Sequence, residues 1–242
     1  MTETRTTCPY CGVGCGVVAS VESGAVSVRG DETHPANFGR LCVKGSALGE
    51  TTGLQGRLLR PVVDGVEVDW GQALGAAGER LQAIMDKWGP QAVAFYASGQ
   101  LLTEDYYVAN KLMKGFIGAA NIDTNSRLCM SSAVVGYKRA FGEDVVPCSY
   151  EDVENSDLVV LVGSNAAWTH PVLYQRLVQA KHSNPQMKVV VIDPRSTATC
   201  DIADLHLALA PGSDAGLFVG LLNLIQGADE WPVERVAACC GL

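Results

Sequence analysis

Residues 157–163 read DLVVLVG, residues 188–193 read KVVVID, and PVLYQRLVQAK lies between them at 171–181. The two apolar runs have the length of buried strands, and the segment between them has the pattern of an amphipathic helix. Buried strands that alternate with helices are typical of parallel sheets covered on both faces. This stretch therefore predicts an α/β fold with a three-layer arrangement.

The same alternation continues on both sides of this stretch. Asp64-Gly65 is a turn dipeptide that predicts a hairpin, and Asp69 is positioned to cap a helix that ends at Gly89-Pro90. The predicted elements are the hairpin 61–68, a helix from 70 to 88, a strand at 92–98, helices at 103–116 and 129–141, a strand at 205–210 and a helix at 215–225.

The first 60 residues have a different character. Alternating segments at 17–22 and 25–30 flank Ser23-Gly24 and predict a short β-hairpin, while the rest is irregular and rich in glycine. We therefore expect a small β module at 1–60, held together by a metal group, followed by an α/β region at 61–242.

Four cysteines lie in that module. Cys8, Cys11 and Cys15 form a C-x2-C-x3-C motif, and Cys42 follows after 26 residues in the string GRLCVKG. Three thiolates on one glycine-rich loop with a distant fourth suit a [4Fe-4S] cluster. Zinc is the alternative, although its usual sites pair two cysteine knuckles, and here the second half has one cysteine.

Charge and hydropathy exclude several functions. The chain has 18 Lys and Arg against 26 Asp and Glu, a net charge of −8, which argues against nucleic acid or an anionic membrane as a general partner. Its apolar runs are shorter than the roughly 20 residues that span a bilayer. The segment MTETRTTCPYCG lacks an apolar signal region, so we expect a cytoplasmic protein.

Three polar loops follow predicted strands and contain Gly163-Ser164-Asn165, residues 193–197 and residues 211–214. Ligands of open α/β sheets bind beyond the carboxyl ends of the strands, so these loops predict a nucleotide-like cofactor site. Neither a G-x-G-x-x-G nor a Walker sequence is present, which argues against NAD and ATP.

Cys129 lies in NSRLCMSS (125–132), where a polar loop leads into the predicted helix 129–141. A helix N-terminus would favour its thiolate, but from the residues alone a small buried cysteine is the more ordinary interpretation. The same interpretation applies to Cys148 and Cys200. His170 and His206 lack a partner at ligand spacing and are expected to be structural.

Taken in order, the cysteine motif, CVKG, NSRLCMSS, GSN, IDPRSTATCDIADLH and APGSD resemble the N-terminal part of the molybdopterin bis-guanine-dinucleotide oxidoreductases over residues 6–226. Within that family, the bacterial assimilatory nitrate reductases are the most similar. The resemblance implies a [4Fe-4S] domain at 1–60, followed at 61–242 by an incomplete molybdopterin-binding region of three-layer α/β type.

The resemblance also implies roles for individual residues. Cys8, Cys11, Cys15 and Cys42 would ligate the cluster, Cys129 would ligate molybdenum with Met130 beside it in the catalytic pocket, and Lys44 would lie between cluster and pterin on the electron path. The residues implied to hold the molybdopterin guanine dinucleotide, two of which the complete family enzyme binds, are Lys44, Ser164, Asn165, Asp193, Arg195, Thr197, Gly212, Ser213 and Asp214.

The reaction implied is the two-electron reduction of nitrate to nitrite and water. Electrons would come from ferredoxin, flavodoxin or an NADH-dependent reductase subunit. Formate dehydrogenase is the main competitor in the family, but its metal-ligating residue is followed directly by histidine, whereas Met130 follows Cys129 here.

Family catalytic subunits are much longer than this chain, and the segment 227–242, with Cys239 and Cys240, does not match the family. We therefore expect a truncated, frameshifted or fragmentary chain that has little activity by itself and leaves an apolar face or sheet edge exposed. A noncatalytic iron–sulfur or cofactor-binding fragment and a zinc-stabilised interaction module are the alternative functions.

Overall fold

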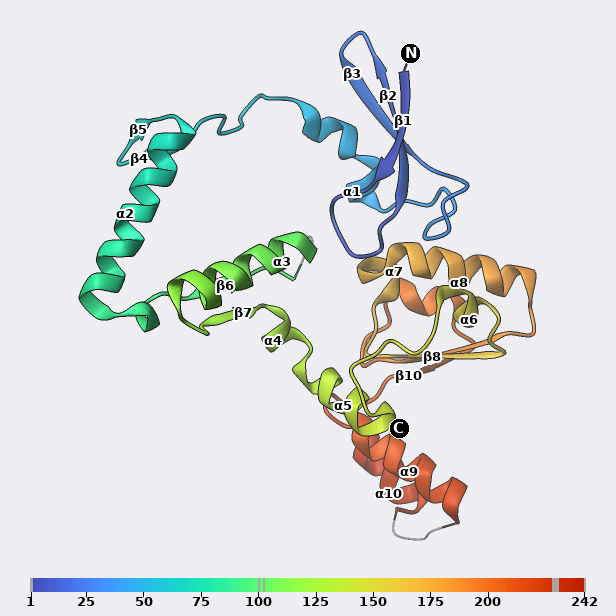
Figure 1. Cartoon of the computed structure of the whole chain (residues 1–242). Coiled ribbons are helices and arrows are strands. Elements are labelled where there is room, and N and C mark those ends of the chain that lie inside the picture. The colour runs from blue at the N-terminus through green and yellow to red at the C-terminus, as the bar shows by residue number, and fades with distance from the viewer. Residues whose placement is uncertain (1, 100, 102, 228–230, 242) are drawn as a thin grey trace. The chain divides into compact units, whose positions relative to one another are not determined.

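The computed structural model describes residues 2–99, 101, 103–227 and 231–241 (Figure 1). The chain divides into two compact units. The first comprises Met1–Gly14, Ala19–Val28 and Ala47–Val145, and the second comprises Cys15–Val18, Arg29–Ser46 and Val146–Leu242.

The N-terminal strands form a three-stranded sheet in the order β1-β2-β3. Strand β1 spans Thr2–Thr7, β2 spans Gly16–Glu22 and β3 spans Ala25–Gly30. The turn between β2 and β3 places Ser23 and Gly24 at positive φ, as a tight hairpin requires. The predicted hairpin is confirmed, whereas β1 was not predicted. Two short helical segments follow, α1 (Val43–Ser46) and η1 (Leu48–Thr52).

The second predicted hairpin and the long helix are also confirmed. Strands β4 (Val62–Val63) and β5 (Val66–Glu67) pair antiparallel across Asp64-Gly65, both at positive φ. Helix α2 spans Trp70–Trp88, and Asp69 and Gln72 form a capping box at its start. The helix stops at Gly89, whose φ of +79° suits glycine, and η2 (Pro90–Ala92) follows.

Two parallel strands, β6 (Phe95–Ala97) and β7 (Ile122–Thr124), form the remaining sheet of the first unit. The predicted strand 92–98 is shorter than expected, and β7 was not predicted. The predicted helix 103–116 begins as α3 (Thr103–Asn110) and continues as the π-helix η3 (Lys111–Ile117), in which Met113 is buried against Val93 and Ala119.

The predicted helix 129–141 is wrong at its start. The structure has α4 (Ser126–Cys129) and α5 (Ser131–Phe141), separated by Met130 at φ −136° and ψ 14°. Cys129 is therefore the last residue of one short helix and lies outside the first turn of the next. The helix-dipole argument for its thiolate does not apply in the form that the sequence predicted.

Three parallel strands in the order β10-β9-β8 form the sheet of the second unit, in register from Leu158 opposite Lys188 to Val162 opposite Ile192. Strand β8 spans Leu158–Val162, β9 spans Lys188–Ile192 and β10 spans Leu205–Leu207. Helices α6 (Tyr150–Glu154) and α7 (Ala166–Thr169) pack against α8 (Pro171–Ser183), and η4 spans Ala198–Ile202.

The two faces of this sheet are covered unequally. Val189 and Val191 are buried on one face, and Figure 1 shows α7 and α8 along one side of the sheet. On the other face Ile192 packs against α9 (Asp214–Gln226) and α10 (Val233–Cys240) through Leu217 and Val236. The arrangement is therefore α/β with three layers, as predicted.

The second helical layer is incomplete. Leu158, Val160 and Val162 share the face of Ile192, yet they remain 56%, 44% and 41% exposed. This agrees with the expected exposed apolar face. Helix α10 was not predicted, and Cys240 is fully buried in the core that it forms with α9.

Candidate cofactor sites

The loop that carries Cys8 and Cys11 directly follows β1. The Cys8 residue is buried and Cys11 is exposed, and Gly14 donates a hydrogen bond from its backbone N to the Cys11 carbonyl at 3.2 Å. An open cavity of about 450 Å³ lies beside the loop, and Asp105 contributes to its wall. The other lining residues are Thr7, Cys8, Pro9, Tyr10, Cys11, Gly12, Gly14, Gly99 and Leu101.

Cys15 and Cys42 belong to the second unit, where buried Asn37 joins their two segments. The Asn37 Oδ1 accepts from the Gly16 backbone N at 2.8 Å, and its Nδ2 donates to the Gly16 carbonyl at 3.1 Å and the Arg40 carbonyl at 2.8 Å. Gly16 follows Cys15, and Arg40 lies two residues before Cys42. One amide side chain therefore fixes the spacing between the two cysteine-bearing segments.

In this region chain segments pass so close to Gly16 and Gly30 that any larger residue at these two positions would clash. A Cβ on Gly16 would lie 2.3 Å from the His34 ring, and one on Gly30 would lie 2.0 Å from the Gly39 carbonyl oxygen. Both contacts are far below van der Waals distance. These glycines therefore allow the 29–46 segment to fold tightly against the residues around Cys15.

Cys42 stands immediately before α1 and is partly buried. Burial raises the pKa of its thiol, but hydrogen bonds from the backbone amides of Gly45 and Lys44, together with the positive charge of Lys44, lower the pKa below its ordinary value overall. Lys44 itself is exposed. A thiol with a lowered pKa is more readily the thiolate that metals bind.

The donor chemistry of these cysteines suits an iron–sulfur cluster. None of the nine cysteines, including the four of the predicted cluster, is in a disulfide. Within the ranges that the structure describes, no group of three or more His, Cys, Asp or Glu side chains is gathered closely enough to hold a metal ion. The assignment of four cluster ligands therefore stays a prediction based on the sequence.

Cys129 is exposed, so the interpretation as a small buried cysteine is wrong. A second open cavity, of about 410 Å³, lies beside it and is lined by Met130, Ser131 and Arg127 among others, although Cys129 itself does not line it. Ser131 Oγ donates to the Arg127 carbonyl, which holds the start of α5 against α4.

The loops after β6 and β7 meet because the two strands are parallel. The Gly99 backbone N donates to Asn125 Oδ1 at 2.6 Å, and a Cβ on Gly99 would lie 3.0 Å from that oxygen. Gly99 also lines the cavity beside Cys8 and Cys11. In the first unit, Gly99 thus lines the cavity beside the loop of Cys8 and Cys11 and is also hydrogen-bonded to Asn125 of the NSRLCMSS segment.

In the second unit, the loops after β8 and β9 are joined by Thr199. Its fully buried hydroxyl donates to Asn165 Oδ1 at 3.0 Å and accepts from the Ala167 backbone N at 3.2 Å. Gly163, at a φ of +56°, turns the chain from β8 toward Ser164 and Asn165. Thr197 caps η4 by accepting from the Thr199 backbone N at 3.3 Å.

The remaining strand-end residues occupy the same edge of the sheet. Asp193 is buried directly after β9 and accepts from the Arg195 backbone N at 2.8 Å, while the Arg195 side chain is exposed. After β10, Gly212 has a φ of +81°, and Ser213 Oγ donates to the Ala210 carbonyl. Asp214 is exposed and begins α9. The predicted convergence of the three loops at the carboxyl edge follows from the parallel pairing of β8, β9 and β10.

Three side chains that hold these sites were not singled out from the sequence: Asn37, Asn125 and Thr199. Asn37 and Asn125 lie in loops and Thr199 lies in η4, and each has a hydrogen-bond partner 21 to 34 residues away along the chain. Their only signal is an Asn or Thr beside a predicted ligand segment, which is also the composition of ordinary turns.

The residues expected to be structural are a mixed group. His206 Nε2 lies 2.8 Å from the Asp193 carbonyl oxygen and donates to it, and His170 contacts Thr169. Cys200 is partly buried, but Cys148 is exposed, so the expectation of a buried residue there is wrong.

No helix in the described part of the chain is long and apolar enough to cross a membrane.

Comparison with known proteins supports both cofactor regions. Residues 1–52 match the molybdopterin oxidoreductase Fe4S4 domain, and residues 57–227 match the molybdopterin oxidoreductase domain. Nitrate reductase of Klebsiella oxytoca is 75% identical over 100% of this chain and 30% of its own length, and nitrate reductase of Shewanella frigidimarina is 50% identical over 98% and 26%.

More distant relatives have different names. An F420-dependent formate dehydrogenase subunit alpha from Methanococcus maripaludis is 36% identical over 91% of this chain and 33% of its own length. The structure of acetylene hydratase from Pelobacter acetylenicus superimposes with a TM-score of 0.80 at 23% identity, over 98% of this chain and 36% of that one. The chain thus spans less than two fifths of the length of these relatives.

Proposed function

The chain belongs to the molybdopterin oxidoreductase family, and from that premise we propose that the protein containing it reduces nitrate to nitrite. The reaction consumes two electrons and two protons and releases water. Membership of the family, with its Fe4S4 domain, means that the cofactors are a [4Fe-4S] cluster and molybdenum with molybdopterin. When bound, molybdenum with molybdopterin supplies the two-electron redox chemistry.

The observation that carries the choice of nitrate is the 75% identity over the whole chain to a protein named nitrate reductase. The residue after the proposed metal ligand supports it, since Met130 stands where formate dehydrogenases place a histidine. The formate dehydrogenase relative is only 36% identical. Formate oxidation is therefore the second candidate.

The residues of this chain have separate tasks in the proposal. Cys8, Cys11, Cys15 and Cys42 hold the cluster, and Lys44 places a positive charge beside it. Cys129 supplies a thiolate ligand to molybdenum, and Met130 and Ser131 shape the adjacent pocket.

The strand-end loops of the second unit hold the guanine dinucleotide. Asp193 offers a carboxylate to amino or hydroxyl donors, and Gly163 and Gly212 let backbone approach phosphate. The remaining members of this set are Ser164, Asn165, Arg195, Thr197, Ser213 and Asp214, with Lys44 at the pterin.

We place the protein in nitrate assimilation in the cytoplasm, with ferredoxin, flavodoxin or an NADH-dependent reductase subunit as electron donor. The two relatives at 75% and 50% identity are named simply nitrate reductase, whereas a periplasmic nitrate reductase of Desulfovibrio desulfuricans is 43% identical. Fractionation of cells followed by detection of the full-length protein tests the location.

The proposed activity is tested on the full-length protein, purified without oxygen. We expect iron, molybdenum and guanine nucleotide in the same sample, and nitrate reduction with reduced viologen but no formate oxidation. Formate oxidation without nitrate reduction would select the second candidate. Iron without molybdenum would indicate a noncatalytic iron–sulfur protein, and zinc without iron an interaction module.

A further inference from the structure

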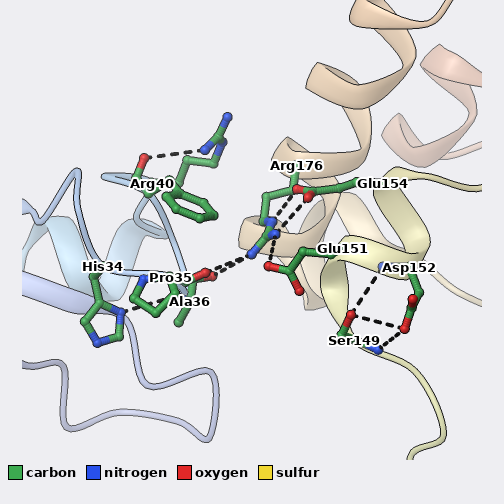
Figure 2. Close-up of polar contacts among 10 residues, drawn as sticks. His34, Pro35, Ala36, Arg40, Ser149, Glu151, Asp152, Glu154 and Arg176 are labelled. Carbon is green, nitrogen blue, oxygen red and sulfur yellow. Dashed lines mark hydrogen bonds and ion pairs between the residues drawn. The ribbon is translucent and has the colours of Figure 1, made fainter.

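Arg176, in the middle of α8, is only 1% exposed although it is charged (Figure 2). Its Nη2 donates to Glu151 Oε1 at 3.0 Å and to Glu154 Oε2 at 2.8 Å, and its Nε donates to Glu154 Oε1. Both glutamates come from α6. The guanidinium thus joins α8 to α6 by a two-pronged contact that only arginine makes.

The opposite edge of the same guanidinium binds the segment that leads to Cys42. Arg176 Nη1 donates to the Pro35 carbonyl at 3.1 Å and to the Ala36 carbonyl at 3.4 Å. Figure 2 shows these carbonyls directed at the arginine from the loop side and the glutamates from the helix side. The guanidinium also lies 5.1 Å from the ring centroids of both Phe38 and Tyr150.

The contact continues along the loop toward both cysteines of the second unit. Asn37, the next residue after Ala36, holds Gly16 beside Cys15 and Arg40 near Cys42. Gln175, the neighbour of Arg176 on α8, donates from Nε2 to the Leu41 carbonyl at 3.4 Å. Helix α8 therefore forms hydrogen bonds with both ends of the 35–41 segment, at Pro35 and at Leu41.

The charges around Arg176 exclude a simple electrostatic role. Two carboxylates face one guanidinium, so these three side chains together have a net negative charge. Arg176 therefore does not act by placing a positive charge near the cysteines. What the arginine adds is geometry, because its planar fork can bind two carboxylates and two carbonyls at once, whereas a lysine ammonium has three donors.

We propose that Arg176 is a positioning residue for the [4Fe-4S] cluster. Its side chain holds the 35–41 segment in place, so that Cys15 and Cys42 keep the separation that the cluster needs. The inference rests on the proposed assignment of these two cysteines as ligands. It makes α8, a helix of the molybdopterin-binding region, part of the support of the cluster.

The test uses the full-length protein with Arg176→Met and Arg176→Lys, purified without oxygen. Lys181→Met is the matched control, since Lys181 lies on the same helix and forms an ion pair with Asp204 at 2.5 Å, remote from the 35–41 segment in sequence and contact. Iron and sulfide per folded chain are measured, together with the electron paramagnetic resonance spectrum of the reduced cluster.

We expect Arg176→Met to lose most of its iron, Arg176→Lys to keep part of it with an altered spectrum, and Lys181→Met to match the wild type. Circular dichroism reports the folded fraction, and if Arg176→Met does not fold, Arg176→Lys decides, because it retains the buried charge. Wild-type iron content and an unchanged spectrum in a folded Arg176 variant would overturn the proposal. Absence of iron from the wild-type protein would instead overturn the ligand assignment on which it rests.

Discussion

Single polar side chains join backbone segments that are distant in the sequence. Three such side chains are almost fully buried: Asn37, Thr199 and Arg176. Each forms hydrogen bonds with two or more polar groups of another segment. A buried polar group is stable only when its hydrogen bonds are made, so these residues tolerate few substitutions. The cysteines proposed as ligands depend on such supports, since their own loops are short and irregular.

Replacing Cys129 by alanine in the full-length protein should lower nitrate turnover by more than about 100-fold, because the soft metal ligand is lost. Iron content should stay at the wild-type level, since the proposed cluster ligands lie in other segments. Reduced-viologen assays and metal analysis measure both. Cys148→Ala, another exposed cysteine, is the control, and full activity in Cys129→Ala would contradict the ligand role.

Replacing Cys42 by serine should remove most of the iron and labile sulfide, because a neutral hydroxyl replaces a thiolate ligand. Cys200→Ser, a substitution at another partly buried cysteine, should leave both unchanged. Equal iron in the two variants, measured per folded chain, would show that Cys42 is not a cluster ligand.

At the scale of elements, capping residues and glycines in the sequence indicate where helices begin and end. The close contacts through which helices pack against one another are not visible in the sequence. The capping box of Asp69 starts α2, and Gly227 at positive φ ends α9. Between α9 and α10, in contrast, the contact depends on a glycine, since a Cβ on Gly220 would lie 2.4 Å from a Val236 methyl group.

The same substitution should therefore have opposite effects in two helices. Gly220→Ala should lower the free energy of unfolding by about 1–3 kcal/mol because the helices must separate. Gly75→Ala, in α2 with no atom within 4 Å of the added Cβ, should raise it by about 0.5–1 kcal/mol through helix propensity. Thermal unfolding followed by circular dichroism compares the two, and a stabilising Gly220→Ala would refute the packing.

At the scale of the whole molecule, ion pairs connect elements of the second unit to one another. Lys181 on α8 donates to Asp204 at 2.5 Å, and Asp204 also accepts from the Val189 backbone N at 2.8 Å, which links helix, strand and the turn before β10. The Lys181 hydrogen bond, followed by that from Val189, lowers the pKa of Asp204 to about 2. Hydrogen bonding from Arg176 likewise lowers the pKa of Glu151.

These shifts predict a loss of stability in acid. Both carboxyl groups have lower pKa values in the folded chain, so their contribution is complete above the ordinary values of 3.8 and 4.5. It is lost as the pH falls toward the folded values, because the unfolded chain then binds more protons. Asp204→Asn should show a smaller fall in thermal midpoint from pH 6 to pH 3 than the wild type. Asp157→Asn is the control, and identical slopes for wild type and Asp204→Asn would contradict the prediction.

The sequence by itself determined the features that depend on neighbouring residues. Apolar periodicity predicted β8, α8 and β9, and turn dipeptides predicted both hairpins, because each depends on contacts within a few residues of chain. Motif order also predicted the family, since the cysteine spacing and the strand-end loops are local strings whose combination is specific.

Only the tertiary structure decided what joins these strings. The contact of Arg176 with Pro35 spans 141 residues, and that of Thr199 with Asn165 spans 34. Likewise, the burial of Cys240 in the core of α9 and α10 follows from packing, and the break of the predicted helix at Met130 was visible only in the structure. Such contacts arise where folding brings distant backbone together, and the energy of a buried hydrogen bond depends on that environment rather than on sequence neighbours.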